Sequence, residues 1–285
     1  MKIKLLSYDN LEQIKIIKRP SKICKTPYIG DGIINEELSQ ETSKTPEEFM
    51  IHTPSLGCCG LCEKDSLVYG LPLNNEKIKS KYRSIISIDA KNNNNLVGIE
   101  PSHGEKIVEL VFENNLLNKL VNVKSYKKQV TFNKSRFDFA GELIENDNTN
   151  DNTNDKNKKN KFILEVKSVP LQQNNIAYFP DGYRKKKTDL VSPRAFKHIE
   201  ELSQICQNQE TNDYECYMCY VIQRNDINKF MISDNDKIYK NAVKDAMNNN
   251  VKIIIIVCEW DINGNLYLIH DKCKLYDNFY DIFDL

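Results

Sequence analysis

The sequence lacks an excess of either charge sign, because its 285 residues contain 40 Lys and Arg and 40 Asp and Glu. A formal net charge of zero gives no general attraction to nucleic acid, so any affinity for phosphates must come from local patches. The sequence also lacks an apolar run near the roughly 20 residues that a membrane-spanning helix requires, and its first nine residues contain no signal-peptide apolar core. We therefore expect a soluble, intracellular protein with no membrane partner.

Histidine is scarce and cysteine is scattered, which limits the metal sites that the chain can build. Four separated histidines give little support to a histidine-based centre. Nine cysteines, an odd number without dense spacing, indicate reduced thiols. Three of them share one glycine-containing turn: Cys58, Cys59 and Cys62. A structural zinc there needs a fourth ligand, from His52 or from Cys216 and Cys219, but that pair lies in an apolar strand and is expected to pack as small hydrophobes.

The first 90 residues show short apolar runs separated by turn residues. Candidate strands cover residues 13–18, 28–35, 48–52, 66–71 and 82–89. Several short strands with turns between them predict a small barrel or sandwich. Residues 36–47 are polar and are predicted to form a loop, and the asparagine-rich stretch at 91–95 is predicted to be a linker. We therefore place the domain boundary between residues 90 and 91.

The remainder, residues 91–285, alternates helical and strand patterns. Helices are predicted from Ser102 to about Asn115, from Ser192 onward and over 238–248, and strands over 121–130, 130–144, 162–169, 214–223 and 251–258. This order predicts an α/β core with a mixed sheet. Residues 145–161, with a tandem Asp-Asn-Thr-Asn repeat, are too polar to pack, so they are expected to be a disordered insertion at a hairpin tip.

The two strands that flank this insertion carry isolated charges. Side chains two apart in a strand share a face, so Glu165 and Lys167 point the same way, while Asp138 lies between two phenylalanines on the preceding strand. Carboxylates at such positions suit a hard divalent cation, and Lys167 suits stabilisation of developing negative charge. An exposed cross-strand ion pair explains the same pattern equally well.

Several different short motifs follow one another in a particular order along most of the chain. They occupy residues 96–99, 107–110, 135–139, 165–169, 179–181, 197–202 and 221–226. In order and spacing they resemble the sugar fermentation stimulation protein A family. The resemblance implies an OB-fold-like barrel in residues 1–90, followed by a PD-(D/E)XK, restriction-endonuclease-like domain in residues 91–285. It further implies a DNA-binding protein that acts as a Mg²⁺- or Mn²⁺-dependent nuclease, or alternatively a non-catalytic, regulatory DNA-binding protein.

The same resemblance implies the site residues. The expected catalytic set is Glu109, Asp138, Glu165, Lys167 and Gln223. Three of these are expected to hold the metal: Asp138, Glu165 and Glu109. On the predicted first helix Glu105, Glu109 and Glu113 recur every four residues, a spacing that by itself favours a solvated edge.

Local charge and aromatic side chains supply candidate contacts to DNA, or alternatively to RNA. The nine candidates are Arg19, Lys22, Tyr28, Arg136, Arg184, Arg194, Lys197, His198 and Arg224. Taken singly, each is more often a solvated surface residue.

Overall fold

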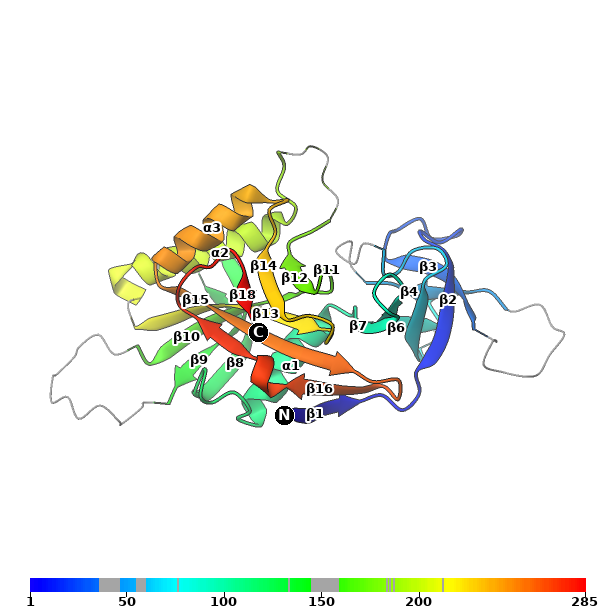
Figure 1. Cartoon of the computed structure of the whole chain (residues 1–285), viewed down its shortest axis with the longest axis horizontal. Coiled ribbons are helices and arrows are strands. Elements are labelled where there is room, and N and C mark those ends of the chain that lie inside the picture. Colours follow the sequence, from blue (N-terminus) through cyan, green and yellow to red (C-terminus); the bar gives the residue numbers. More distant parts are fainter. Residues whose placement is uncertain are drawn as a thin grey trace.

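The chain forms a small barrel beside a larger α/β unit (Figure 1). The structure is a computed structural model that describes residues 1–35, 47–54, 60–75, 77–132, 134–144, 159–182, 184, 186, 188–211 and 213–285. Most of the predicted loop at 36–47 and of the predicted insertion at 145–161 lies outside these residues, as do Cys58 and Cys59 of the predicted zinc turn. Within the described ranges, no helix is long and apolar enough to cross a membrane.

Five strands close the barrel. They are β2 (Glu12–Lys18), β3 (Ile29–Ile34), β4 (Phe49–His52), β5 (Leu67–Pro72) and β6 (Tyr82–Asp89). Strand β2 pairs antiparallel with β3 and β5, β3 pairs with β4, β5 pairs with β6, and a parallel pairing of β4 with β6 completes the ring. Alternate residues, including Ile14, Ile16 and Ile51, fill the interior. This is the strand order of an OB-fold, as predicted.

Two strands lie outside the domains that the sequence predicts for them. Strand β7 (Asn95–Gly98) pairs with β6, so the stretch predicted as a linker is the turn of a hairpin, with Asn93 and Asn94 at positive φ. Strand β1 (Lys2–Ser7) pairs with β16 (Asn265–Ile269) of the large sheet. Ile3 and its neighbours cover part of that sheet's core, so the boundary at 90/91 is corrected at both ends of the barrel.

The large sheet has the order β1-β16-β15-β13-β10-β9-β8, with β17 paired to β15. Its further strands are β8 (Val123–Phe132), β9 (Ser135–Leu143), β10 (Lys161–Ser168), β13 (Tyr214–Gln223), β15 (Val251–Trp260) and β17 (Lys274–Tyr276). The central strands β10, β13 and β15 are parallel and the others antiparallel, so the sheet is mixed as predicted. Helix α1 (Ser102–Glu113) packs on one face, and α2 (Pro193–Gln207) and α3 (Lys237–Asn248) pack on the other. Coverage on both faces explains the continuous apolar runs of β13 and β15.

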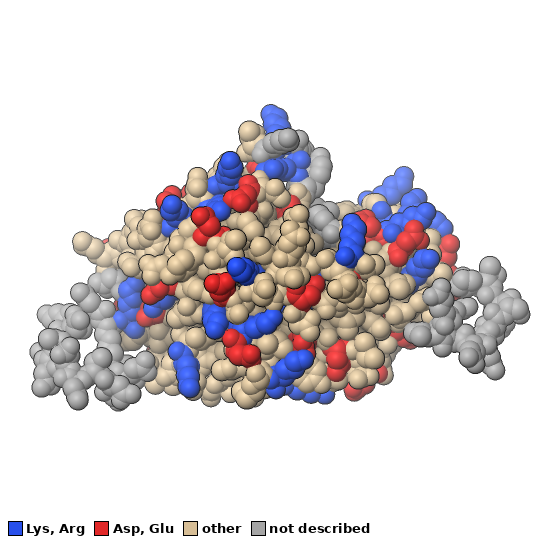
Figure 2. Space-filling view, in the orientation of Figure 1, with Lys and Arg blue, Asp and Glu red and all other residues tan. Residues whose placement is uncertain are grey.

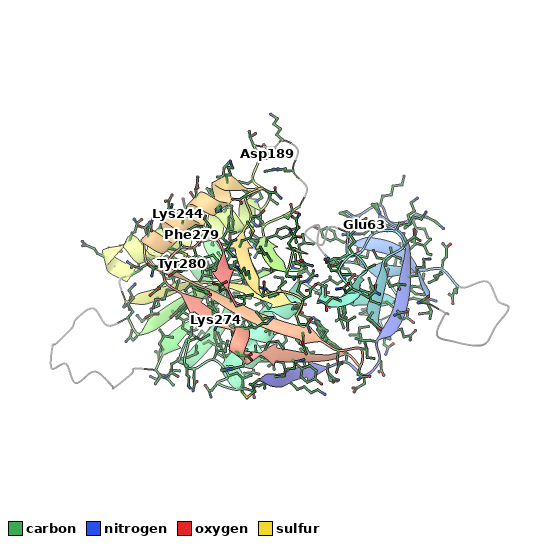
Figure 3. The ribbon with its side chains drawn as sticks, viewed as in Figure 1. Glu63, Asp189, Lys244, Lys274, Phe279 and Tyr280 are labelled. Atoms are coloured by element: carbon green, nitrogen blue, oxygen red, sulfur yellow. The ribbon has the colours of Figure 1, made fainter. Side chains whose placement is uncertain are left out.

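A second sheet of short strands lies beside the large one. Its order is β11 (Gln172–Gln173), β12 (Ile176–Phe179), β14 (Lys229–Ile232) and β18 (Phe283–Asp284). The C-terminal segment is fixed by aromatic contacts, because Phe279 and Tyr280, both labelled in Figure 3, pack edge-on against Phe283. Phe283 is buried in the same core as α2 and α3.

The barrel and the large unit meet through close contacts. A Cβ atom on Gly98 of β7 would lie 2.3 Å from Gln223 Oε1 and 2.6 Å from Trp260 Nε1, so only glycine permits this approach. The Arg224 guanidinium reaches across from the large unit to Asp89 of the barrel, with Nη2 2.9 Å from Asp89 Oδ2. These contacts fix the barrel against the carboxyl ends of β13 and β15.

Candidate active site

The candidate site begins where two strands separate. Strands β9 and β10 pair as far as Phe139 and Leu164, and then β9 continues along β8 alone. The backbone N–H of Val166, which has no β9 carbonyl to bond, donates instead to Asp138 Oδ2 at 2.8 Å. The fork therefore holds the Asp138 carboxylate between the diverging strands.

A pocket of about 270 Å³ opens at this fork. It is lined by Pro101, Glu105, Asp138, Glu165, Val166, Lys167, Ser168, Phe179, Ser192, Arg194 and Ala195. Three carboxylates and two cationic side chains thus share one small volume. The structure brings Asp138, Glu165 and Lys167 together, as the sequence predicts.

Glu165 is the most deeply buried acid of the pocket, with 1% of its surface exposed. Its Oε1 contacts the Lys167 ammonium and His198 Nδ1, and its Oε2 is buried without a hydrogen-bond partner among the described residues. Burial alone would raise the pKa of Glu165, but His198 and Lys167 bring that pKa below its ordinary value. Glu165 is therefore ionised near neutral pH, and one of its oxygens is available to a ligand.

Asp138 has the opposite electrostatic character. Burial, followed by the neighbouring charge of Glu165, raises the pKa of Asp138 to about 6, although the Val166 N–H lowers it. The amide of Gln129 donates to Asp138 Oδ1 at 3.1 Å and to Glu105 Oε2 at 2.7 Å. Two carboxyl groups whose environments move their pKa values apart are characteristic of functional sites.

The acid that α1 contributes is Glu105, which corrects the prediction of Glu109. The carboxylate of Glu109 is bound by Lys106 at 3.0 Å and Lys128 at 2.7 Å, and it does not line the pocket. Helix α1 approaches β10 at Gly104, where an added Cβ would lie 2.7 Å from Ser168 Oγ. This close approach places the first turn of α1, and therefore Glu105, at the pocket.

Gln223 also lies away from the pocket, so its predicted catalytic role is corrected. Its side chain is buried at the barrel interface, where Oε1 accepts a hydrogen bond from Trp260 Nε1 at 3.2 Å. Gln223 lies two residues after Val221, so the two side chains are on the same face of the sheet, the face that α1 covers, whereas Glu165 faces α2. Gln223 thus joins the two units.

Three of the predicted nucleic-acid contacts are buried and hold the fold. Arg224 is fully buried and binds Asp226, Asp89 and the Pro170 carbonyl. The Arg19 side chain, 6% exposed, donates to the carbonyls of Pro27 and Pro54 and pairs with Glu63, which is labelled in Figure 3. His198 is buried against Glu165. None of these side chains is positioned to meet a phosphate at the surface.

The other predicted contacts have different surroundings. Arg194 lines the pocket, Arg136 is exposed on β9, and Tyr28 is exposed just before β3. Lys22 pairs with Glu48 at 2.7 Å, Lys197 donates to the Lys134 carbonyl at 2.9 Å, and Arg184 donates to the Asn235 carbonyl. On the face shown in Figure 2, acidic and basic side chains are interspersed, in line with the zero net charge.

The site offers two carboxylates to a metal ion. Among the described residues, no three His, Cys, Asp or Glu side chains are close enough to hold an ion between them. Asp138 and Glu165, one with an unpartnered oxygen, match the one or two carboxylates by which Mg²⁺ is commonly held, with water and substrate oxygens completing the shell. The donor set therefore fits a hard divalent cation.

Sequence reasoning missed Glu105 and Gln129. The stripe of three glutamates marked the correct helix face, but its equal spacing could not single out one member. Gln129 has positive φ and stands opposite Asp138 on β8, between the Lys128–Phe139 and Val130–Phe137 pairs. No sequence signal marks a glutamine in that conformation.

Comparison with known proteins identifies the relatives of this fold and site. The family described as "Sugar fermentation stimulation protein RE domain" matches residues 102–264, more than half of the chain. The chain belongs to the sugar fermentation stimulation protein family. The resemblance drawn from the sequence motifs is confirmed.

Two relatives in the family cover most of the chain. The homologue from Clostridium acetobutylicum is 27% identical over 259 residues, which covers 90% of this chain and 94% of the relative. That from Clostridium kluyveri is 26% identical over 230 residues, covering 80% and 87%. The solved structure titled "The structure of Pyrococcus Furiosus SfsA in complex with Ca2+" has a TM-score of 0.71 at 17% identity, covering 94% of this chain and 96% of that one. The family protein from Pyrococcus therefore shares both the barrel and the mixed-sheet unit.

Proposed function

We propose that this protein is a divalent-metal-dependent nuclease that hydrolyses phosphodiester bonds, with DNA as its preferred substrate. The observation that carries the proposal is the fork of β9 and β10, which places Asp138, Glu165 and Lys167 in one pocket. The arrangement of an acid on one strand and a Glu-x-Lys on its neighbour is that of the PD-(D/E)XK nucleases that the sequence resembles. The related Pyrococcus structure, whose title names bound Ca²⁺, adds support, since Ca²⁺ and Mg²⁺ both choose oxygen ligands.

Asp138 and Glu165 would hold the ion, and Glu105 would contact its water shell, because Gln129 links Glu105 to Asp138. A bound Mg²⁺ or Mn²⁺ would supply Lewis acidity and lower the pKa of a bound water. Burial, and after it the neighbouring charge of Glu165, raises the pKa of Asp138 to about 6, and a bound cation would offset both effects by stabilising the ionised carboxylate.

Lys167 and Arg194 supply the positive charge that the protein itself contributes to the site. The Lys167 ammonium contacts Glu165 and lies 3.2 Å from the Val166 carbonyl, so it is held over the fork as a hydrogen-bond donor. There it would orient the attacking water and stabilise negative charge on the scissile phosphate. Arg194, in the first turn of α2, presents a planar fork of donors that suits a phosphate oxygen pair.

The direct test is a cleavage assay. Purified protein is incubated with single- and double-stranded DNA and RNA, with Mg²⁺, Mn²⁺ or EDTA. We expect metal-dependent cleavage that falls about 100-fold or more in Lys167→Met, since one preorganised charge donor is removed. Lys186→Met, which removes a lysine from outside the pocket, serves as the control. Cleavage that persists in EDTA or in Lys167→Met would overturn the mechanism.

A second prediction separates the two glutamates of α1. Glu105→Gln should weaken Mn²⁺ binding about 10-fold or more, because it removes an outer charge that is linked to Asp138 through Gln129. Glu109→Gln, one turn along the same helix, should leave Mn²⁺ affinity unchanged, because Lys106 and Lys128 neutralise that carboxylate at the surface. Isothermal titration with Mn²⁺ measures both. Equal losses of Mn²⁺ affinity in the two variants would show that Glu109 contributes to metal binding as much as Glu105 does.

A non-catalytic DNA-binding protein is the second candidate, favoured by one observation. Lys167 and His198 already compensate the charge of Glu165 without a metal ion. In that case binding should be strong, metal-independent and steeply salt-dependent, and no substrate should be cleaved. Filter binding across a salt series, run beside the cleavage assay, separates the two candidates.

A further inference from the structure

A second pocket, of about 330 Å³, lies along one face of β12 and β14, from the turn that precedes β12 to the loop that follows β14. Apolar surface comes from Ile176, Tyr178 and Met231, and polar groups come from Gln173, Asn174, Ser233, Asp234 and Asn235. We propose that this pocket binds a nucleobase of the strand whose phosphate occupies the catalytic pocket, and that it selects a base carrying an exocyclic amino group. The inference rests on the proposed nuclease function and adds a base-reading subsite to it.

The chemistry of the lining matches a base better than a phosphate. A nucleobase has flat apolar faces and a polar edge, so it packs on rings and thioethers and forms hydrogen bonds at its rim. The Tyr178 ring and Met231 supply the first kind of surface, and side-chain amides and hydroxyls supply the second. Among the described residues that line the pocket, the charged one is Asp234, whose negative charge disfavours a phosphate.

Asp234 gives the pocket its selectivity. An ionised carboxylate only accepts hydrogen bonds, so it favours the amino group of cytosine over the carbonyl oxygen that thymine presents at the same position. Its position is fixed by Lys240, whose Nζ lies 2.8 Å from Asp234 and 3.1 Å from Asp281. The Asp234 side chain remains 66% exposed, so it is accessible to a ligand.

The two pockets share the end of one strand. Tyr178 lines the base pocket and Phe179, the next residue of β12, lines the catalytic pocket, because successive side chains of a strand point to opposite faces. The backbone N–H of Ser233 donates to the Phe179 carbonyl at 2.8 Å and joins the end of β14 to that of β12.

The surroundings of the base pocket suit a strand that passes between the two units. Figure 1 shows β11, β12 and β14 on the side of the large unit that faces the barrel, and Tyr178 packs against the barrel core. Arg184 donates to the Asn235 carbonyl at the rim of the pocket. Its guanidinium is therefore near enough to the base pocket to neutralise a phosphate of a strand bound there.

The test compares two oligonucleotides that differ in the predicted group. Fluorescence anisotropy measures binding of oligodeoxycytidylate and oligothymidylate of equal length, with Mg²⁺, to the full chain carrying Lys167→Met so that the strand is not cleaved. We expect oligodeoxycytidylate to bind about 10-fold more tightly. Asp234→Asn should bring this ratio close to one, and Asp281→Asn, which removes an equivalent charge from the same lysine outside the pocket, should leave it unchanged.

The outcomes distinguish the inference from the function on which it rests. Equal binding of the two oligonucleotides, or an equal change of the ratio in Asp234→Asn and Asp281→Asn, would overturn the base pocket and leave the proposed nuclease standing. Absence of binding to either oligonucleotide by this variant, together with absence of cleavage by the wild type, would overturn both.

Discussion

Replacing Asp138 by asparagine should abolish metal-dependent cleavage and, at the same time, stabilise the protein at neutral pH. Cleavage should fall about 1,000-fold or more, because the substitution removes a charge that we propose holds the metal ion. Stability should rise because the pKa of Asp138 is raised from 3.8 to about 6 in the folded chain. At pH 7 the fold therefore carries an ionised carboxylate that burial disfavours, at a cost of up to about 3 kcal/mol.

The pH dependence follows from the direction of that shift. The folded protein binds the Asp138 proton more tightly than the unfolded chain, so the contribution of this group to stability is fully present below about pH 4 and is lost as pH rises through about 6. Asparagine cannot ionise, and its side-chain oxygen still accepts the Val166 N–H. The gain of the variant in free energy of unfolding, about 1–2 kcal/mol after the weakened hydrogen bonds are counted, should therefore appear at pH 7 and vanish at pH 4.

Thermal unfolding in EDTA at pH 7 and pH 4 measures this gain, with EDTA present so that metal does not stabilise the wild type alone. Wild-type cleavage should in turn increase as pH rises through about 6, because a carboxylate must lose its proton to hold a cation. An Asp138→Asn variant that melts at or below the wild-type temperature at pH 7 would show that Asp138 is not an electrostatically unfavourable group.

Replacing Arg224 by methionine should destabilise the protein severely. The guanidinium is fully buried and binds Asp226 through two donors at 2.7 Å, Asp89 at 2.9 Å and the Pro170 carbonyl at 2.7 Å. Methionine fills much of the volume but leaves two carboxylates without their counter-charge. Removal of one partner from a buried ion pair typically costs about 3–5 kcal/mol.

Urea denaturation of Arg224→Met measures this loss, and Arg136→Met, an exposed arginine on β9, is the matched control with an expected change within about 0.5 kcal/mol. Adding Asp89→Asn to Arg224→Met should recover part of the stability, because it removes one of the orphaned charges. If Arg224 were a phosphate contact instead, its replacement would weaken DNA binding and leave the free energy of unfolding unchanged.

The strands and helices of the core follow from the sequence pattern, whereas the partners of several side chains do not. Strand β15 could be predicted because its nearly continuous β-branched run indicates burial on both faces, and β13 could be predicted from its long apolar run. Strand β1 is short, and no local feature tells that it pairs with β16 rather than with the barrel. The two-residue strands β11 and β18 are too short to show any periodicity.

The same limit applies to the site. Glu165 and Lys167 were predictable because strand alternation places them on one face. Asp138 was predictable from the family motif alone, since its neighbours Phe137 and Phe139 pack in cores on opposite sides of the sheet. The choice of Glu105 over Glu109 depends on the contact between Gly104 and Ser168, residues that are far apart in the chain. Arg224 looks like any basic residue in the sequence, and its burial is set by Asp89, a partner 135 positions away.

The pairing of β1 with β16 makes the barrel an insert within the large unit. The chain starts in the large sheet, leaves it to build the barrel, and returns through β7 to α1, so two covalent connections tether the barrel to its neighbour. A body held at two points can pivot about the line that joins them but cannot swing freely, as it would on a single linker. The barrel is therefore more restricted in its movement relative to the large unit than it would be on a single linker, and the buried contact of Arg224 with Asp89 restricts it further.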